Sequence, residues 1–305
     1  MSLPPVRPDR DDGAPVWAPP RGSHLVPGQL AWEELAVGHH CQTWLCWSAE
    51  LWQPTLVKVA RPGWSRPRWT RALGREARAL RAVRHPVFPR LLGDGTRAPL
   101  PHLVLEYLDG PALDEVVGED GPLPAPDAAR LGVALLSALR GLHAAGHAHL
   151  DVCPDNVLLV DRRARLVDLG ASRPLGHGLR RGEEVGTDGF VAPELAAARG
   201  GPVTAAMDVH GVGATLRAVL DPGSGPGPLD GVLDALTDPD PAARPTVEQA
   251  LRLLVRRTGR GADRPWPRWA DRELAPAGRG DPRSTRSRAF ARVVRRGTAD
   301  GCAAR

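Results

Sequence analysis

The 305-residue sequence contains one lysine, Lys58, among 40 basic residues, so arginine supplies nearly all of its positive charge. An ammonium and a guanidinium are not interchangeable, because the ammonium is a compact charge on a flexible stem and suits a narrow phosphate-binding cleft. A lysine retained in so arginine-rich a chain marks position 58 as a candidate anion site. The alternative, a surface lysine without a function, is judged by where Lys58 falls among the other elements.

Cysteines and long apolar runs are also scarce. The four cysteines, Cys41, Cys46, Cys153 and Cys302, show no CxxC spacing, which argues against a zinc ribbon and against a disulfide framework. No apolar run approaches the ~20 residues of a membrane span, and the N-terminus lacks a charged-then-apolar signal. We therefore expect a cytoplasmic protein.

The two ends of the chain differ in composition from the middle. Residues 1–25 are rich in proline, arginine and aspartate without periodicity, and we expect them to be disordered. Residues 258–305 carry twelve arginines against five acidic residues, so the basic balance of the protein belongs to this tail. We expect a disordered tail, which is either a solvated extension or a contact for acidic partners; no specific nucleic acid is expected.

The middle of the chain changes character near Gly110. Within residues 26–108, short apolar runs split by turn residues predict an antiparallel sheet over about 26–60, with strands at 35–37, 43–47 and 55–59, and further apolar runs follow at 90–92 and 102–107. One helix interrupts them, over 68–84, where Trp69, Leu73, Leu80 and Val83 form an apolar stripe around Glu76. Residues 109–257 are mainly helical, beginning with a long helix over 125–145. The fold class is therefore α+β, with a β-rich N-terminal lobe and a larger helical C-terminal lobe.

Polar residues gather in the segment that follows that long helix. Residues 149–156 read His-Leu-Asp-Val-Cys-Pro-Asp-Asn, and Asp168-Leu-Gly follows after an apolar run. Further segments read Gly-Thr-Asp-Gly-Phe-Val-Ala-Pro-Glu over 186–194, Met-Asp-Val-His-Gly over 207–211, and Asp-Pro-Ala-Ala-Arg-Pro over 240–245. In this combination the chain, over about 26–255, resembles the bacterial serine/threonine protein kinases.

The resemblance implies a role for each matching residue. Lys58 lies 18 residues before Glu76, the spacing at which the family forms an ion pair that directs the lysine to ATP phosphates. The catalytic residues implied are Asp151, which accepts the proton of the attacking hydroxyl, Lys58, Glu76 and Thr187. The ATP-binding residues implied are Gly38, Lys58, Leu105, Glu106, Leu108, Asn156 and Asp168, and Asn156 and Asp168 also hold Mg²⁺. His143, His147 and His149 are not expected to bind a metal.

The chain departs from the family pattern at three places. Cys153 replaces a lysine that neutralises the γ-phosphate, and His40 and Thr43 stand where the second and third loop glycines would be. Leu150 replaces an arginine that pairs with a phosphorylated activation loop, so we expect no control by phosphorylation of that loop. The sequence thus predicts a serine/threonine kinase that uses ATP and Mg²⁺ as cofactors and proteins as substrates. We expect its phosphoryl transfer to be slow because Cys153 replaces the lysine. The alternative is a pseudokinase, an ATP-binding or empty scaffold that acts through protein interaction.

Overall fold

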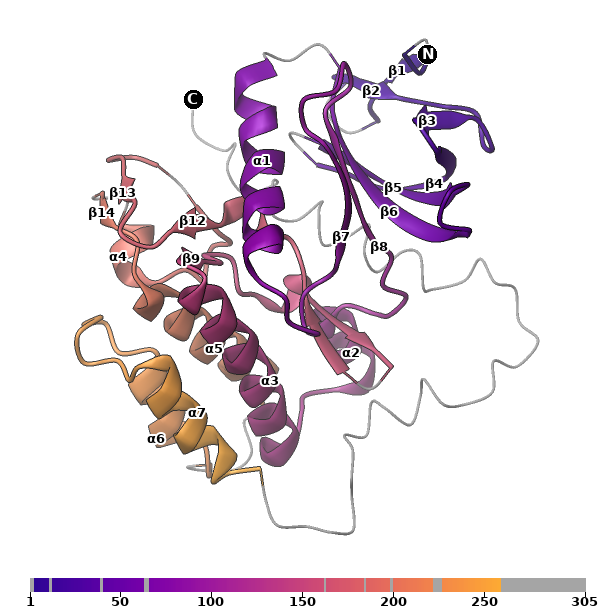
Figure 1. Cartoon of the computed structure of the whole chain (residues 1–305). Helices are drawn as coiled ribbons and strands as arrows, with labels where there is room; N and C mark the ends of the chain where they lie inside the picture. The colour runs from indigo at the N-terminus through magenta and orange to yellow at the C-terminus, as the bar shows by residue number, and fades with distance from the viewer. Residues whose placement is uncertain are drawn as a thin grey trace. The chain divides into compact units, whose positions relative to one another are not determined.

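The computed structural model describes residues 3–10, 13–38, 41–62, 66–161, 163–183, 185–197, 200–221 and 227–258, with the backbone alone at 66–69 (Figure 1). The described chain divides into two compact units. Unit 1 runs through Arg81 and resumes from Pro89 to Asp109, and unit 2 holds Ala82–Phe88 and the chain from Gly110 onward. The predicted tail lies outside the described residues beyond Thr258, and the predicted limits at 25, 108 and 257 remain predictions.

Unit 1 is built on a six-stranded sheet in which all neighbouring strands run antiparallel. The strands, in spatial order, are β3 (His24–Val26), β4 (Gln29–Val37), β5 (Cys41–Ser48), β6 (Gln53–Ala60), β8 (His102–Glu106) and β7 (Leu91–Gly95). Short loops join β3, β4, β5 and β6 in sequence, which is why consecutive strands are neighbours. The strands predicted from the alternating pattern are confirmed.

The register of β5, β6 and β8 gives this sheet two distinct faces. Successive side chains on a strand point to opposite faces, and directly paired residues share a face. The apolar face carries Trp44, Cys46, Val57, Val59 and Val104, all in one buried core cluster. We call the opposite side the lysine face, and its residues are Thr43, Leu45, Leu56, Lys58, Leu103 and Leu105.

The prediction that residues 1–25 are disordered is wrong for the residues that the structure describes. A hairpin of β1 (Val6–Pro8) and β2 (Pro15–Trp17) forms, with Val6 opposite Trp17. The Trp17 ring is buried in the core cluster of the apolar face, and its Nε1 donates to the carbonyl oxygen of Ala60 at 2.7 Å. Burying the Trp17 ring removes a large apolar area from water, and this stabilises the hairpin although the composition of residues 1–25 is typical of disordered segments.

The helix predicted over 68–84 is α1 (Arg66–Ala82), which is drawn beside the sheet of unit 1 (Figure 1). Leu73, Glu76 and Leu80 are buried, as the three- and four-residue spacing of the stripe requires. The Trp69 side chain lies outside the described part. The helix ends shortly before His85-Pro86, because the residue that precedes a proline disfavours helical backbone.

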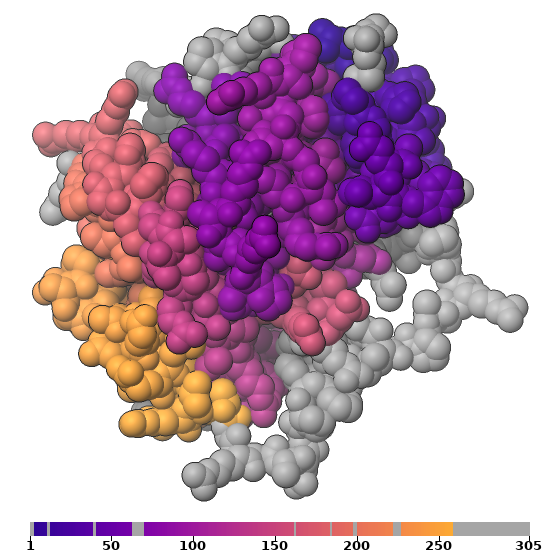
Figure 2. All heavy atoms as spheres, viewed as in Figure 1, coloured from indigo at the N-terminus to yellow at the C-terminus, as the bar shows by residue number. Residues whose placement is uncertain are grey.

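Unit 2 is organised around α3 (Ala125–Ala144), the long helix predicted at 125–145. Its leucines at 131, 135, 139 and 142 are buried, and it packs against α5 (Ala205–Val219) and α7 (Val247–Val255). The remaining helices are α2 (Leu113–Asp120), α4 (Pro193–Ala196) and α6 (Asp230–Leu236). A capping box of Thr246 and Gln249 begins α7, which belongs to the orange part of the surface in Figure 2.

Short strands complete unit 2. They form three two-stranded pairs: β10 (Val157–Val160) with β11 (Arg163–Leu166), β9 (His147–Ala148) with β12 (Arg173–Pro174), and β13 (Gly178–Leu179) with β14 (Gly201–Pro202). One 3₁₀ turn, Pro154–Asn156, leads into β10, and another, Leu169–Ala171, follows β11. No helix among the described residues combines the length and apolar character that a membrane crossing requires.

Candidate active site

The single lysine of the chain is held in a buried ion pair within unit 1. Lys58 Nζ lies 2.8 Å from Glu76 Oε1 and 2.9 Å from Oε2, and the two side chains are 4% and 2% exposed. Removing two charges from water is costly, and a close, two-oxygen contact offsets much of that cost. The lysine is thus fixed between β6 and α1, as the spacing of the two residues predicts, and the surface-lysine alternative is wrong.

A second polar group shares the lysine face. Thr43, directly opposite Lys58 in the β5–β6 register, is fully buried, and its Oγ1 has no hydrogen-bond partner among the residues that the structure describes. A buried hydroxyl without a partner is unfavourable by a few kcal/mol, typically about 1–3. A bound molecule with hydrogen-bonding oxygens would satisfy it.

The apolar residues of the lysine face include some that the sequence reading did not select. Leu105 is buried, as predicted for the position behind an adenine ring, and Leu56 and Leu45 line the same face. Leu56 lies two residues before Lys58, and Leu45 is its cross-strand partner. The period of two in a strand was the signal that could have identified both residues.

The predicted hinge residues follow directly at the end of β8. The backbone N–H of Glu106 donates to Arg90 at 2.9 Å, and its carboxylate accepts from the Arg90 N–H at 3.0 Å. Leu108, two residues on, is buried. The first residue of the predicted phosphate loop, Gly38, donates its N–H to the carbonyl of Cys41 at 2.9 Å. His40 lies outside the described residues.

A cluster of polar residues lies in unit 2, where the β10–β11 hairpin brings two parts of the sequence together. Val157 pairs with Leu166, so the residues just outside this pair, Asn156 and Val167, are neighbours, and the Val167 N–H donates to the Asn156 carbonyl at 2.9 Å. Asp168 follows immediately, with φ of 60° and ψ of 75°. Its Oδ1 accepts from the Gly170 N–H at 3.1 Å, which fixes the carboxylate at this turn.

Asp151 is the centre of the same cluster. Thr187 Oγ1 donates to its Oδ1 at 2.7 Å, and Asn156 Nδ2 donates to its Oδ2 and to its carbonyl, both at 2.9 Å. Burial raises the pKa of Asp151 and the hydrogen bond from Thr187 opposes that rise, while the negative charge of Asp168 adds to it. The structure therefore brings Asp151, Asn156, Asp168 and Thr187 together, as the sequence predicts.

Asp208 of α5 holds the backbone at His149 and Leu150, directly before Asp151. Its carboxylate accepts from the backbone N–H of His149 at 2.8 Å and of Leu150 at 2.7 Å. His143 Nε2 contacts it at 2.7 Å, a contact that sequence reasoning missed because the two residues are 65 positions apart. Burial acts to raise the pKa of Asp208, but the His143 hydrogen bond and nearby histidine charge outweigh it, and the pKa is lowered.

Cys153 lies beside the cluster, with its Sγ 3.7 Å from Thr187 Oγ1. It is buried, and burial, followed by the negative charge of Asp151, raises the pKa of the thiol far above its ordinary value. The side chain is therefore a neutral thiol at physiological pH. It adds no positive charge to a site that already holds two carboxylates.

The segment after Asp168 is held at both ends. Ser172 Oγ donates to the Ala148 carbonyl at 2.7 Å, and at the far end the Arg244 guanidinium binds both carboxylate oxygens of Glu194 at 2.7 Å. Leu150, at φ 68°, is buried in a cluster with apolar residues of this segment, among them Val185 and Val191. An apolar contact thus stands where the family pattern has an arginine.

The fold and the cluster define a two-lobed kinase-type protein. A sequence profile of the protein kinase domain matches residues 33–223. The chain belongs to the protein kinase domain family. The similarity is to bacterial serine/threonine protein kinases.

Three relatives show how far this similarity extends. PknB of Mycobacterium leprae is 30% identical over 206 residues, which are 65% of this chain and 33% of that protein. AfsK of Streptomyces coelicolor is 32% identical over 214 residues, 66% of this chain and 26% of that protein. PkaA of the same organism is 35% identical over 191 residues, 60% of this chain and 35% of that protein. The chain spans about a third or less of each relative's length.

Proposed function

We propose that the chain is a serine/threonine protein kinase that transfers the γ-phosphate of Mg-ATP to a protein hydroxyl. The observation that carries the proposal is the buried Lys58–Glu76 pair, since the one lysine of the chain occupies the family's phosphate-binding position. The Asp151 cluster supplies the second half of the machinery. Phosphoryl transfer requires mainly positioning and charge stabilisation, and these residues offer both.

The residues fit a nucleotide and a magnesium ion. Mg²⁺ prefers oxygen ligands, and the carboxylate of Asp168 and the amide oxygen of Asn156 are brought together by the β10–β11 hairpin. The partnerless Thr43 Oγ1 lies on the lysine face, where it would donate to an oxygen of the nucleotide. The metal, when bound, neutralises charge on the phosphates.

Asp151 is proposed to receive the proton of the attacking hydroxyl. Its two carboxylate oxygens are oriented by Thr187 and Asn156, so the side chain is held in one geometry. The raised pKa brings its proton affinity closer to that of a base working near neutral pH. The Thr187 position and the Glu194–Arg244 pair match the family's support for a protein substrate.

We infer that the segment after Asp168 is not switched by phosphorylation. Its hydroxyl residues before Glu194 are Ser172 and Thr187. Ser172 is 1% exposed and bonded to Ala148, and Thr187 is bonded to Asp151. Leu150 supplies apolar packing in place of a phosphate-binding arginine, so no charged partner for a phosphate stands at that position.

A scaffold without transfer is the second candidate, and the neutral Cys153 thiol favours it. One charge contact in a transition state is typically worth ~10²–10³ in rate. The absence of that contact slows transfer, but Lys58, Asp151, Asn156 and Asp168 all remain. We therefore propose a slow enzyme as the principal reading.

The two candidates are separated by measuring Mg-ATP-dependent thermal stabilisation and transfer of labelled γ-phosphate in three proteins. These are the wild type, Lys58→Met and Cys153→Lys. A slow kinase shows transfer in the wild type, loss in Lys58→Met and a gain in Cys153→Lys. Stabilisation by Mg-ATP without transfer in any of the three would support the scaffold.

A further inference from the structure

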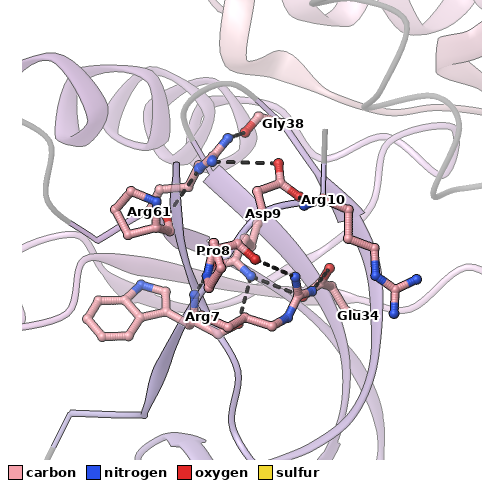
Figure 3. Close-up of polar contacts among 10 residues, drawn as sticks. Arg7, Pro8, Asp9, Arg10, Glu34, Gly38 and Arg61 are labelled. Carbon is pink, nitrogen blue, oxygen red and sulfur yellow. Dashed lines mark hydrogen bonds and ion pairs between the residues drawn. The ribbon is translucent and has the colours of Figure 1, made fainter. Parts of the chain in front are cut away.

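The N-terminal hairpin is joined to the start of the phosphate loop by one buried arginine. Arg61 follows the last residue of β6, three positions after Lys58, and its side chain is 2% exposed. Its Nη1 donates to the carbonyl oxygen of Gly38 at 3.2 Å, and its Nη2 lies 3.6 Å from Asp9 Oδ2. Figure 3 shows dashed lines from the Arg61 guanidinium to Gly38 and to Asp9.

A further contact keeps the guanidinium in this orientation. Arg61 Nε lies 3.5 Å from the carbonyl oxygen of Pro15, the first residue of β2. Asp9 and Pro15 both belong to the hairpin region whose Trp17 is buried on the apolar face of the sheet. Arg61 therefore acts from the side of the sheet opposite the lysine face.

The other end of the loop is joined to the same hairpin through Gln42. Its fully buried amide accepts from the Trp17 N–H at 2.7 Å and donates to the Trp17 carbonyl at 2.9 Å. This pair of hydrogen bonds resembles the pairing of an additional strand. Gly38 and Gln42, which flank the loop, are thus both tied to residues of the hairpin.

The family achieves close approach of this loop to phosphate with several glycines, whereas this chain retains only Gly38 of the three. Since a peptide group is planar, holding the Gly38 carbonyl on one side sets the direction of the whole peptide that leads into the loop. A loop with fewer glycines has fewer backbone conformations available, and fixing its entry selects among them. The contact thus offers a physical substitute for glycine's adaptability.

We propose that Arg61, oriented by Asp9 and Pro15, is a positioning residue that fixes Gly38, the first residue of the phosphate loop, for nucleotide binding. The N-terminal hairpin is then part of the nucleotide site although it does not touch the ligand. This inference rests on the proposed function for its consequence and on the contacts of Arg61 for its geometry.

The test compares the full chain with Arg61→Ala, Arg61→Lys and Asp9→Asn. The control is Arg21→Ala, because Arg21 lies in the same N-terminal segment and its guanidinium stacks on the exposed Trp32 ring, 3.6 Å from the ring centroid, rather than on Gly38 or Gln42. Amide hydrogen exchange over 36–46 is measured without nucleotide, and KM for ATP and kcat are measured separately. Calorimetry with Mg-ADP gives binding without turnover.

Arg61→Ala is expected to speed exchange over 36–46 and to raise KM and the Mg-ADP Kd roughly tenfold, with kcat within about twofold of wild type. Arg61→Lys, which keeps one donor, restores part of the loss. Asp9→Asn shows a smaller effect of the same kind, and Arg21→Ala shows none. The proposal is overturned if Arg61→Ala lowers Tm but leaves loop exchange and KM unchanged, or if Arg21→Ala has the same effects as Arg61→Ala. A wild type that binds no nucleotide would defeat the proposed function, and the exchange data would still decide whether Arg61 holds the loop.

Discussion

Lys58 and Cys153 illustrate two opposite uses of charge in this chain. Lys58 keeps a cation where the phosphates are expected and meets the cost of burial through Glu76. Cys153 removes a cation from the catalytic loop and leaves a neutral thiol beside Asp151. The Lys58 ammonium therefore supports the binding of phosphate, whereas the Cys153 thiol lowers the expected rate of phosphoryl transfer.

The stability of the Lys58–Glu76 pair is testable directly. Glu76→Ala leaves the buried ammonium without this carboxylate, and we expect the free energy of unfolding of unit 1 to fall by about 3–5 kcal/mol. Urea unfolding followed by tryptophan fluorescence reports unit 1, because seven of the nine tryptophans lie between residues 17 and 69. Arg81→Ala is the control within the same unit, since it breaks the Arg81–Asp94 pair, in which the Arg81 side chain is 61% exposed, and we expect a loss of at most ~1 kcal/mol. Equal losses in the two variants would contradict the account of the pair.

Much of the site was predictable at the residue scale. The 18-residue separation of Lys58 and Glu76 places them on adjacent elements. Asp151, Asn156 and Asp168, which the motif spacing selects, lie in one cluster because β10 and β11 pair as a hairpin. The contact of His143 with Asp208 was not predictable, since it joins positions that only the packing of α3 on α5 brings together. The place of the unsatisfied Thr43 hydroxyl opposite Lys58 was likewise not predictable, because it depends on the register of β5 and β6.

At the scale of elements, the segment from Asp168 to Glu194 is ordered by packing. Its contacts with Leu150 are apolar, and its ends are fixed by Ser172 and by the Glu194–Arg244 pair. A segment held in this way requires no added phosphate to become ordered. We propose that the apolar cluster around Leu150 takes the place of a phosphorylation switch.

Leu150→Ala tests this role of the apolar cluster. We expect a loss of about 2–5 kcal/mol in the stability of unit 2 and faster proteolysis within 175–192, because the cavity removes the side chain that contacts the segment. Leu254→Ala is the matched control, as Leu254 of α7 is fully buried away from this cluster. Limited proteolysis with mass spectrometry distinguishes them. Equal losses of stability with the same cleavage sites in both variants would contradict this role of Leu150.

Elements with a strong local pattern were predicted well, and the one large error lies at the N-terminus. The stripe of Leu73 and Leu80 and the leucines of α3 are periodic within the sequence, so their helices follow from it. The β1–β2 hairpin has no such pattern. It is stabilised by Trp17 contacting Gln42 and Ala60, which are 25 and 43 positions away, and composition carries no information about such contacts.

At the scale of the whole molecule, two carboxylates make the fold sensitive to acid. Burial acts to raise the pKa of Asp208 and of Glu194, but hydrogen bonds from His143 and Arg244 outweigh it and lower both values. A depressed carboxyl pKa contributes stability that is fully present above the unfolded value, about 4. That contribution is lost as the pH falls through the lower folded pKa.

We therefore expect Tm to fall steeply as pH drops from about 5 to below 4. Asp208→Asn should lower Tm at pH 7, by the equivalent of about 1.5–3 kcal/mol for bonds to a charged group, and should show a shallower acid slope. Asp234→Asn, an exposed position, should retain the wild-type slope. Differential scanning calorimetry across this range gives both quantities. An unchanged acid slope in Asp208→Asn would remove this carboxylate from the explanation.

The central claim is that the Asp151 cluster transfers phosphate from Mg-ATP to a hydroxyl. The most direct measurement compares transfer to a serine- and threonine-containing peptide by wild type and by Asp151→Asn, with the Kd of Mg-ATP determined for each. We predict slow but measurable transfer by the wild type, a decrease in kcat of about 10²–10⁴ in Asp151→Asn, and similar affinity for Mg-ATP. A folded wild type that binds Mg-ATP and transfers nothing, or an Asp151→Asn variant as active as wild type, would contradict it.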